Sequence, residues 1–324
     1  MKILQVTAPG EFKILEQAVP EAGPGEALVK VLAVTTCPQW DLHLSHNEPM
    51  FVGHQFRYPY TPGQPGHEMT GEVVAVGPDV LGLEPGDRVS AWRDPGSARP
   101  GCYAQYVVHR TEDLIRVPAH LPGEATAPLE LAMCVGAVFL MFRTMGGIEG
   151  KRFAVSGLGP AGLIALQMAR AEGASSVTGF DLSEARRQMG LSLGLDKALD
   201  PRTLSQSKAP ERPAPIPFDC AVDCVGAKAS VEFLMDQVKD IVALFGVQRE
   251  PYEFQPRHWM GGLRLCGYKG HSRAAAEYAV DLIEQGQLQL SPLSTHNLPL
   301  ESYGEAIRLL ETQEAVKVCF WPWR

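Results

Sequence analysis

The sequence predicts two domains, one mainly β and one α/β with a doubly wound parallel sheet. A chain of 324 residues is too long for one ordinary domain and has room for two. Over the first part of the chain, short apolar or alternating runs are separated by glycine and proline turns, which is typical of β structure. From about Leu131, long apolar helical segments alternate with compact strands, the pattern of βαβ units.

The elements of the N-terminal part are short strands. Each combines apolar and β-branched residues with partial period-two alternation, and each is bounded by glycine, proline or polar residues. We expect strands at residues 26–34, 71–77, 87–92, 103–109 and 114–118. Together they predict a mainly β domain.

The C-terminal part alternates strands and helices. We expect strands at 152–156, 176–181, 219–226, 241–247, 263–268 and 315–320, and helices at 162–173, 183–194, 273–286 and 302–313. Four prolines between residues 208 and 218 predict an extended surface loop there. The apolar run at 131–142 is too short to cross a membrane and predicts a buried helix.

The charge and the cysteine content exclude several classes of function. The net charge is -8 and there is no basic run, which argues against nucleic acid and anionic membrane surfaces as partners. The N-terminal residues form no long apolar segment, so we expect no export signal. Seven cysteines without a disulfide-scaffold spacing are then expected to be reduced thiols, and the protein to be cytoplasmic.

A glycine motif follows the strand expected at 152–156. Gly157, Gly159 and Gly162 give the spacing G-x-G-x-x-G where a helix begins. In a dinucleotide-binding turn the first glycine permits the tight turn, the second lets the backbone approach a pyrophosphate, and the third lets helix and strand pack closely. The order of strand, turn and helix predicts a Rossmann domain; the alternative is the same turn without a ligand.

The strand that follows this helix ends in Asp181. A carboxylate at that position accepts hydrogen bonds from the ribose hydroxyls of NAD and repels the 2′-phosphate of NADP. We therefore expect NAD as the cofactor. Arg186, a little further along the chain, either flanks the adenosine or is an ordinary arginine on a helix surface.

Four further residues are candidate ligands of a metal ion. Cys37 follows the first long strand, and the pair His67-Glu68 follows a Pro-Gly turn. Glu130 stands in an apolar segment, where a carboxylate is costly to bury unless it is paired or binds a metal. Thiolate, imidazole and carboxylate suit a catalytic zinc with one exchangeable position. Taken singly, Cys37 is better explained as a buried thiol and His67 as a turn histidine, but a nucleotide-binding domain in the same chain favours the metal site.

With these motifs the chain resembles the zinc-dependent medium-chain dehydrogenase/reductase family, which contains alcohol and polyol dehydrogenases. The resemblance covers nearly the whole chain and rests on TTCPQWDLH, PGHEMTGEVVAVG, LEPGDRV, APLELAMC, GLGPAG, DCVG and PLESYGEAIRLLETQEAVKV, in this order. It implies a GroES-like catalytic domain at 1–131 and 268–324, interrupted by a Rossmann domain at 132–267.

The resemblance also implies roles for the candidate ligands. Cys37 and His67 match the family's catalytic zinc ligands, and Glu130 matches the third protein position. Glu68 matches a carboxylate that is a direct ligand in some members and lies behind the ligands in others. The resemblance therefore leaves open whether Glu68 or Glu130 binds the metal directly.

Two residues after Cys37 resemble the family's proton relay. His43 lies near the histidine that ends the relay, and Asp41 matches the acid that steadies the zinc-bound imidazole. The family usually has Cys-Gly-Ser/Thr-Asp-x-His. Residues 37–43 are one residue longer and lack the relay hydroxyl, so we expect a lengthened loop here.

The resemblance also places the cofactors. The candidate residues for the dinucleotide are Gly157, Gly159, Pro160, Gly162, Asp181, Arg186, Val225 and Gly226, and the resemblance places the last two beside the nicotinamide. The family's four-cysteine structural zinc lobe is missing, because residues 91–108 contain Cys102 alone. We therefore expect one catalytic zinc and no structural zinc.

These features together predict an NAD- and zinc-dependent alcohol dehydrogenase. The carboxylate of Glu130 favours a polyol or sugar alcohol over a simple alcohol as the small-molecule substrate, and the resemblance suggests a homodimer or homotetramer. One alternative is a zinc-free quinone or enone reductase of the same fold, against which Cys37, Glu130 and Asp181 argue. Another is a dinucleotide-binding protein without catalysis, which turnover of any alcohol with NAD would exclude.

Overall fold

The chain folds into two compact units, each described here by itself. A computed structural model describes residues 1–51, 53–204 and 217–324. The first unit contains Met1–Met133 and Gln289–Arg324, and the second contains Cys134–Leu288. The first is mainly β and the second is α/β, as predicted. The proline-rich loop expected at 208–218 falls almost wholly outside the described residues.

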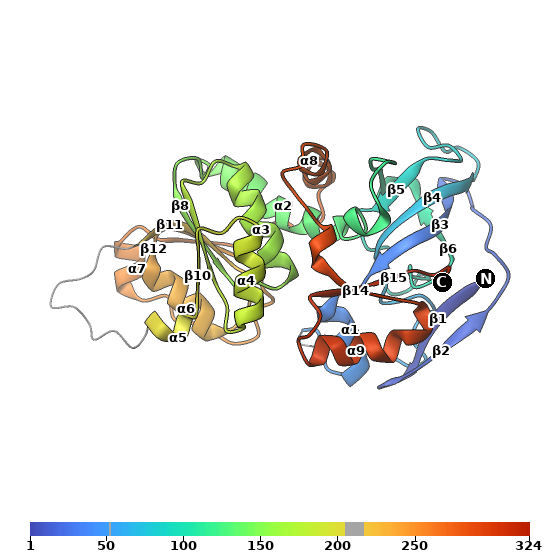
Figure 1. Ribbon diagram of the computed structural model, residues 1–324, viewed down its shortest axis with the longest axis horizontal. Helices are drawn as coiled ribbons and strands as arrows, with labels where there is room; N and C mark the ends of the chain where they lie inside the picture. Colours follow the sequence, from blue (N-terminus) through green and yellow to red (C-terminus); the bar gives the residue numbers. More distant parts are fainter. Residues whose placement is uncertain (52, 205–216) are drawn as a thin grey trace. The chain divides into compact units, whose positions relative to one another are not determined.

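The first unit is built on a seven-stranded sheet and a two-stranded one. Its strands are β1 (Lys2–Ala8), β2 (Glu11–Glu16), β3 (Glu26–Thr35), β4 (Glu68–Val76), β5 (Arg88–Ala91), β6 (Tyr106–Arg110), β7 (Leu114–Arg116), β14 (Ser294–Leu298) and β15 (Lys317–Phe320), with helices α1 (Pro38–His46) and α9 (Tyr303–Glu311). The larger sheet runs β14-β15-β3-β4-β5-β7, with β6 also paired to β3. In Figure 1 the red C-terminal elements of this unit lie beside the blue N-terminal ones.

The strand β3 is the centre of this sheet and carries the site. Most of its residues are buried, as expected for an apolar strand with neighbours on both sides. Its last residue, Thr35, is opposite Glu68 of β4 and Cys319 of β15. The C-terminal strand therefore lies next to the segment that leads into Cys37, although it is almost the whole chain away in sequence.

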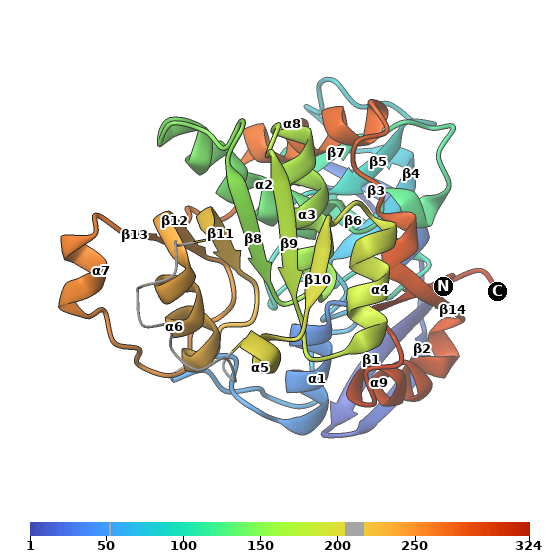
Figure 2. The ribbon, with the colours of Figure 1, turned by 60° about the vertical axis from the view of Figure 1, so that its left-hand side comes forward.

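The second unit has the doubly wound topology that the glycine motif predicts. Its elements are β8 (Arg152–Ser156), α3 (Pro160–Ala171), β9 (Ser176–Phe180), α4 (Glu184–Ser192), β10 (Lys197–Leu199), α5 (Pro201–Leu204), β11 (Phe218–Asp223), α6 (Lys228–Gln237), β12 (Val238–Leu244), α7 (Pro256–Met260), β13 (Arg264–Cys266) and α8 (Arg273–Glu284). The strands run β10-β9-β8-β11-β12-β13, all parallel, so the order reverses at β8 (Figure 2). A ligand in such a sheet binds at the carboxyl ends of the strands where the order reverses.

The helix α2 (Leu129–Thr144) begins in the first unit and continues into the second. Among the described residues, the segment Gly123–Thr144 is the one helical stretch long and apolar enough to cross a membrane by length and composition. However, 78% of its apolar window is buried within the protein, as is usual for a core helix. This agrees with the buried helix expected at 131–142.

The chain returns to the first unit later than the sequence suggests. We expected the return at about residue 268, whereas the first unit resumes at Gln289. The difference is the helix α8, which packs on α2 within the second unit. A Cβ at Gly136 of α2 would lie 3.2 Å from the Ala275 carbonyl oxygen and from the Tyr278 ring, so the two helices are in close contact there.

Candidate active site

Cys37 lies where β3 leads into α1. Its backbone is extended (φ -101°, ψ 97°) and it is the N-cap of α1, with Pro38 in the first turn. Proline suits this position because its missing N–H would have no partner within the helix. The lengthened loop expected at 37–43 is therefore wrong. The extra residue is accommodated by a helix that holds the half-buried thiol at its N-terminus.

His67 is buried, and its ring is oriented by the backbone. Its Nδ1 donates to the Pro65 carbonyl oxygen at 2.7 Å, which leaves the lone pair on Nε2. That Nε2 lies 3.7 Å from Oε2 of Glu130. Burial alone would lower the pKa of His67, but its contacts with the Cys37 thiol and the Glu130 carboxylate raise it well above the ordinary value. Two groups that form anions thus contact one imidazole, which suits a bound cation.

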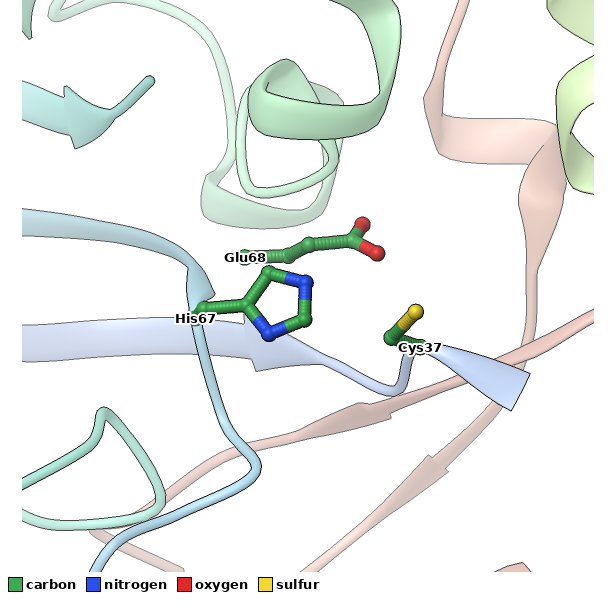
Figure 3. Close-up of side chains that lie close together, drawn as sticks. All are labelled: Cys37, His67 and Glu68. Atoms are coloured by element: carbon green, nitrogen blue, oxygen red, sulfur yellow. The ribbon is translucent and has the colours of Figure 1, made fainter. Parts of the chain in front are cut away.

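The structure also brings Glu68 to Cys37 and His67. One ligand atom from each of these three residues lies within 4.8 Å of the other two, and Figure 3 shows the side chains grouped together. Both carboxylate oxygens of Glu68, however, lie 2.7 Å from Nζ of Lys317, and Oε2 also accepts from the Thr35 hydroxyl. The Glu68 carboxylate is therefore already paired with Lys317, the first residue of β15.

The donor set fits a zinc ion. A thiol, an imidazole with its outer nitrogen fixed on a carbonyl, and a carboxylate are the groups that bind zinc in proteins. Cys37, His67 and one of the two glutamates, Glu68 or Glu130, would hold it. Three protein ligands leave the fourth position for water or substrate, as in catalytic rather than structural zinc sites.

Among the described residues, Asp41 makes no hydrogen bond to His67, the ring that it was expected to steady. Its carboxylate is fully buried and accepts from the backbone N–H of Cys37 at 2.8 Å. It also accepts from the hydroxyls of Tyr103 (2.8 Å) and Tyr303 (2.9 Å). The expectation fails because the Pro65 carbonyl already occupies Nδ1 of His67. Asp41 fixes the backbone of Cys37 instead, and burial raises the pKa of Asp41 to about 6.

His43 lies on the same helix, outside the group of candidate ligands. It is buried in the last turn of α1, and its Nδ1 lies 3.1 Å from the backbone carbonyl oxygen of Glu48. A carbonyl only accepts, so Nδ1 carries the proton. The role of His43 in proton transfer stays a prediction.

The three glycines of the G-x-G-x-x-G motif lie in the turn between β8 and α3 and at the start of α3. Gly157 has a φ of +85°, which disfavours any side chain. A Cβ at Gly162 would lie 1.8 Å from the Gly157 carbonyl oxygen, so helix and turn are in direct contact there. A Cβ at Gly159 would meet nothing within 4 Å, so space is open at that residue. The turn is tight and closely packed, and it is open where a pyrophosphate would approach Pro160 and the N-terminus of α3.

Asp181 follows β9 and contacts the glycine turn. Its Oδ2 accepts from the N–H of Leu158 at 2.7 Å, and its Oδ1 accepts from the N–H of Ser183 at 2.8 Å. The carboxylate is thus held next to the turn that faces the nucleotide. Arg186 lies in the first turn of α4, where burial lowers its pKa and Asp181 opposes that effect.

Val225 and Gly226 follow β11, the strand beside β8. Val225 is half exposed, and its Cγ2 would lie 2.7 Å from a Cβ at Gly157. Gly226 has a φ of +81° and donates its N–H to Asp223. Both residues therefore lie beside the glycine turn, at the point where the strand order reverses.

Two family descriptions match the chain in the order that these units require. The alcohol dehydrogenase GroES-like domain matches residues 23–119, and the zinc-binding dehydrogenase domain matches residues 160–285. The chain belongs to the zinc-dependent medium-chain dehydrogenase/reductase family. It is therefore an oxidoreductase of the alcohol dehydrogenase type, with a zinc ion and a dinucleotide as cofactors.

Relatives of this dehydrogenase match it over nearly their whole length. The L-threonine 3-dehydrogenase of Pyrococcus horikoshii is 29% identical, and the match covers 99% of this chain and 98% of that protein. A zinc-binding dehydrogenase from Sinorhizobium meliloti bound to NADP has a TM-score of 0.82 at 25% identity and covers 99% of each chain. The galactitol-1-phosphate dehydrogenase of Escherichia coli has a TM-score of 0.82 at 24% identity, covering 99% and 100%.

Sequence reasoning missed three residues that support the dehydrogenase site. These are Lys317, Tyr103 and Tyr303, which hold Glu68 and Asp41. Lys317 had a readable signal, because a lysine within the apolar strand AVKVCF needs a buried partner, as Glu130 does in its own segment. The two tyrosines gave no such signal, since tyrosine is common in any core.

Proposed function

We propose that this chain oxidises a small alcohol, namely a polyol, a sugar alcohol or a simple alcohol, using NAD and a single zinc ion. The observation that carries the proposal is the convergence of Cys37, His67 and a carboxylate on one place in a chain that also has a dinucleotide turn. The absence of a four-cysteine lobe in the sequence supports a single zinc. The carboxylate of Asp181 beside the glycine turn supports NAD over NADP.

Among the two glutamates, we assign Glu130 as the direct ligand. Glu130 already lies 3.7 Å from the nitrogen of His67 that would bind the metal. The oxygens of Glu68 are both bonded to Lys317, and a carboxylate neutralised in this way is a weaker ligand. In this assignment Glu68 does not bind the zinc, and it pairs with Lys317 next to the ligands.

The residues around the zinc would then have separate roles. When bound, zinc supplies a Lewis acid that polarises the substrate oxygen, and NAD supplies a hydride acceptor. Pro65 fixes the tautomer of His67, and Asp41 fixes the backbone of Cys37. His43, whose Nδ1 faces the Glu48 carbonyl oxygen, is assigned to proton transfer through Nε2.

Elemental analysis combined with a coupled assay tests this proposal. Protein purified without added metal should contain about one zinc per chain, because the sequence supplies one ligand set. It should reduce NAD with at least one member of a panel of polyols, sugars and primary alcohols. Removal of the metal by a chelator should abolish turnover, and zinc should restore it. Two zinc ions per chain, or none after reconstitution, would contradict the proposal.

The assembly and the location of the enzyme also remain proposals. We propose a homodimer or homotetramer in the cytoplasm, supported by the family resemblance. Light scattering of the purified enzyme gives the first property, and cell fractionation gives the second.

A further inference from the structure

A pocket of about 150 Å³ lies beside His67 in the first unit. Its lining includes Trp40, Tyr60, Gln64 and Asp94 as well as His67. Because His67 is a candidate zinc ligand, this pocket borders the place where a substrate oxygen would reach the metal. The chemistry of the lining therefore bears on which substituents the substrate carries.

Two side chains of this pocket, Gln64 and Asp94, present hydrogen-bond acceptors. Gln64 is buried, and its amide nitrogen donates to the backbone carbonyl oxygens of Gly96 (3.3 Å) and Arg99 (3.1 Å). Both of its N–H groups are used in this way, and its carbonyl oxygen remains for a ligand. Asp94 adds a carboxylate, whose Oδ1 accepts from the N–H of Gly96 at 2.8 Å. A ligand that satisfies these groups must donate hydrogen bonds.

The charge of the pocket is not balanced by its neighbours. Within the described residues, Arg93 pairs with Asp113 at 3.7 Å, and Arg99 pairs with Glu26 at 2.5 Å. In that same part of the chain, no lysine, arginine or histidine lies within ion-pair distance of the Asp94 carboxylate. A carboxylate or phosphate that lies beside Asp94 would therefore meet a like charge that no lysine or arginine side chain of the described residues neutralises.

The aromatic side chains make the wall of the pocket rigid. Trp40 packs edge-on against Phe56, and Phe56 packs edge-on against Tyr60. Such rings accommodate the carbon backbone of a small alcohol, and their faces attract cations.

From these observations we propose that Asp94 is a specificity residue, and that the substrate carries a hydrogen-bond donor next to the reacting hydroxyl and no anionic group. A second hydroxyl or an ammonium group meets this requirement. The inference rests on the proposed alcohol oxidation at this site. It separates this chain from two relatives whose names specify substrates with a carboxylate or a phosphate, L-threonine and galactitol-1-phosphate.

A matched series of alcohols tests the inference on the zinc-loaded enzyme with NAD. The compounds CH3–CH(OH)–CH2–X share the reacting carbon and differ only in X. They are 2-butanol (methyl), 1,2-propanediol (hydroxyl), 1-amino-2-propanol (ammonium) and 3-hydroxybutyrate (carboxylate). We expect kcat/KM for the diol or the amine to exceed that for 3-hydroxybutyrate by at least about tenfold. The ratio of kcat/KM for the diol to kcat/KM for the amine shows which hydrogen-bond donor the pocket prefers.

The variant Asp94→Asn identifies the cause of this preference. It should raise kcat/KM for 3-hydroxybutyrate relative to 2-butanol by about tenfold and lower the same ratio for the amine. Glu112→Gln is the matched control, because it removes one negative charge from an exposed side chain that does not line the pocket, and it should change neither ratio. Equal use of the carboxylate compound by the wild type, or ratios unaffected by Asp94→Asn, would overturn the inference.

Calorimetric titration separates this inference from the proposed function. The same compounds, titrated into the zinc-loaded protein with NADH, which cannot oxidise an alcohol, should bind in the same order. A protein that binds the diol or amine but oxidises no alcohol contradicts the proposed function and supports the role of Asp94. A protein that oxidises alcohols but prefers 3-hydroxybutyrate contradicts the role of Asp94 alone.

Discussion

Lys317 and Glu68 form an ion pair that is entirely buried, with Nζ 2.7 Å from both carboxylate oxygens. Lys317 is the first residue of β15, Glu68 is the first residue of β4, and β3 lies between the two strands. Glu68 also follows His67 directly in the chain. The pair therefore neutralises a carboxylate that would otherwise add negative charge beside the candidate zinc site.

This ion pair predicts that replacing either residue alone lowers the free energy of unfolding more than replacing both. Either Glu68→Gln or Lys317→Met leaves a buried charge without its partner and should lower the free energy of unfolding by about 3 to 5 kcal/mol. The double variant should recover most of that loss, because both charges are then gone. Urea unfolding of the four proteins gives the coupling free energy. Removal of the exposed pair of Lys2 and Glu301 is the control and should have a much smaller effect. Additive losses in the double variant would show that the pair is not coupled.

The variants Glu130→Ala and His43→Ala should lose activity for different reasons. Without the carboxylate of Glu130 the site has one ligand fewer, so the zinc content should fall after dialysis against a mild chelator. His43 lies outside the ligand group, so its removal should leave the zinc content intact and lower turnover by roughly tenfold to a thousandfold. Elemental analysis and the NADH assay on both variants separate the two roles. Loss of zinc from His43→Ala would make His43 a ligand.

Asp181→Asn should narrow the preference for NAD over NADP. The substitution removes the charge that repels a 2′-phosphate and keeps a side-chain oxygen for the N–H of Leu158. The ratio of kcat/KM values for the two cofactors should fall by up to roughly a hundredfold. Glu184→Gln, which changes an exposed acid on the following helix, is the control and should leave the ratio unchanged. Equal use of both cofactors by the wild type would contradict the prediction.

His109 should make the first unit less stable in mild acid. It is fully buried with its Nε2 3.3 Å from the Cys102 thiol, and burial together with Arg99 lowers the pKa of His109 to about 4. Its pKa in the unfolded chain is about 6.5, so as the pH falls the unfolded state takes up the proton first. The free energy of unfolding should therefore decrease between about pH 6.5 and 4, by up to about 3 kcal/mol.

The variant His109→Gln isolates this contribution. Urea unfolding of both proteins near neutral pH and near the folded pKa gives two differences in free energy. The variant should lose less stability than the wild type on acidification, because its side chain does not titrate. The same loss in both proteins would show that other groups cause the acid sensitivity.

The parts of the site that could be predicted from the sequence are those carried by local patterns. The order of strand, glycine turn and helix is contained in a short segment, as is a carboxylate in an apolar run, such as Glu130. The pairing of Glu68 with Lys317 could not be read in this way, because 249 residues separate the partners and strand order decides the contact.

The helix after Cys37 shows a second limit of sequence reasoning. The family pattern suggested an inserted residue in a loop, but Pro38 in a first helical turn and Asp41 bonded to the N–H of Cys37 make a helix start. Asp41 was assigned by its position in that pattern. Its real partners, Tyr103 and Tyr303, are supplied by distant parts of the chain that no local pattern links to it.

The residues that complete the supports of the candidate zinc site are synthesised after the whole second unit. Tyr303 reaches Asp41, and Lys317 reaches Glu68, and both belong to the segment that follows Leu288. While the ribosome makes the second unit, the two buried carboxylates of the first unit have not met these partners. The first unit therefore completes its core only after the second unit has been synthesised, and insertion of the metal into its final geometry follows that step.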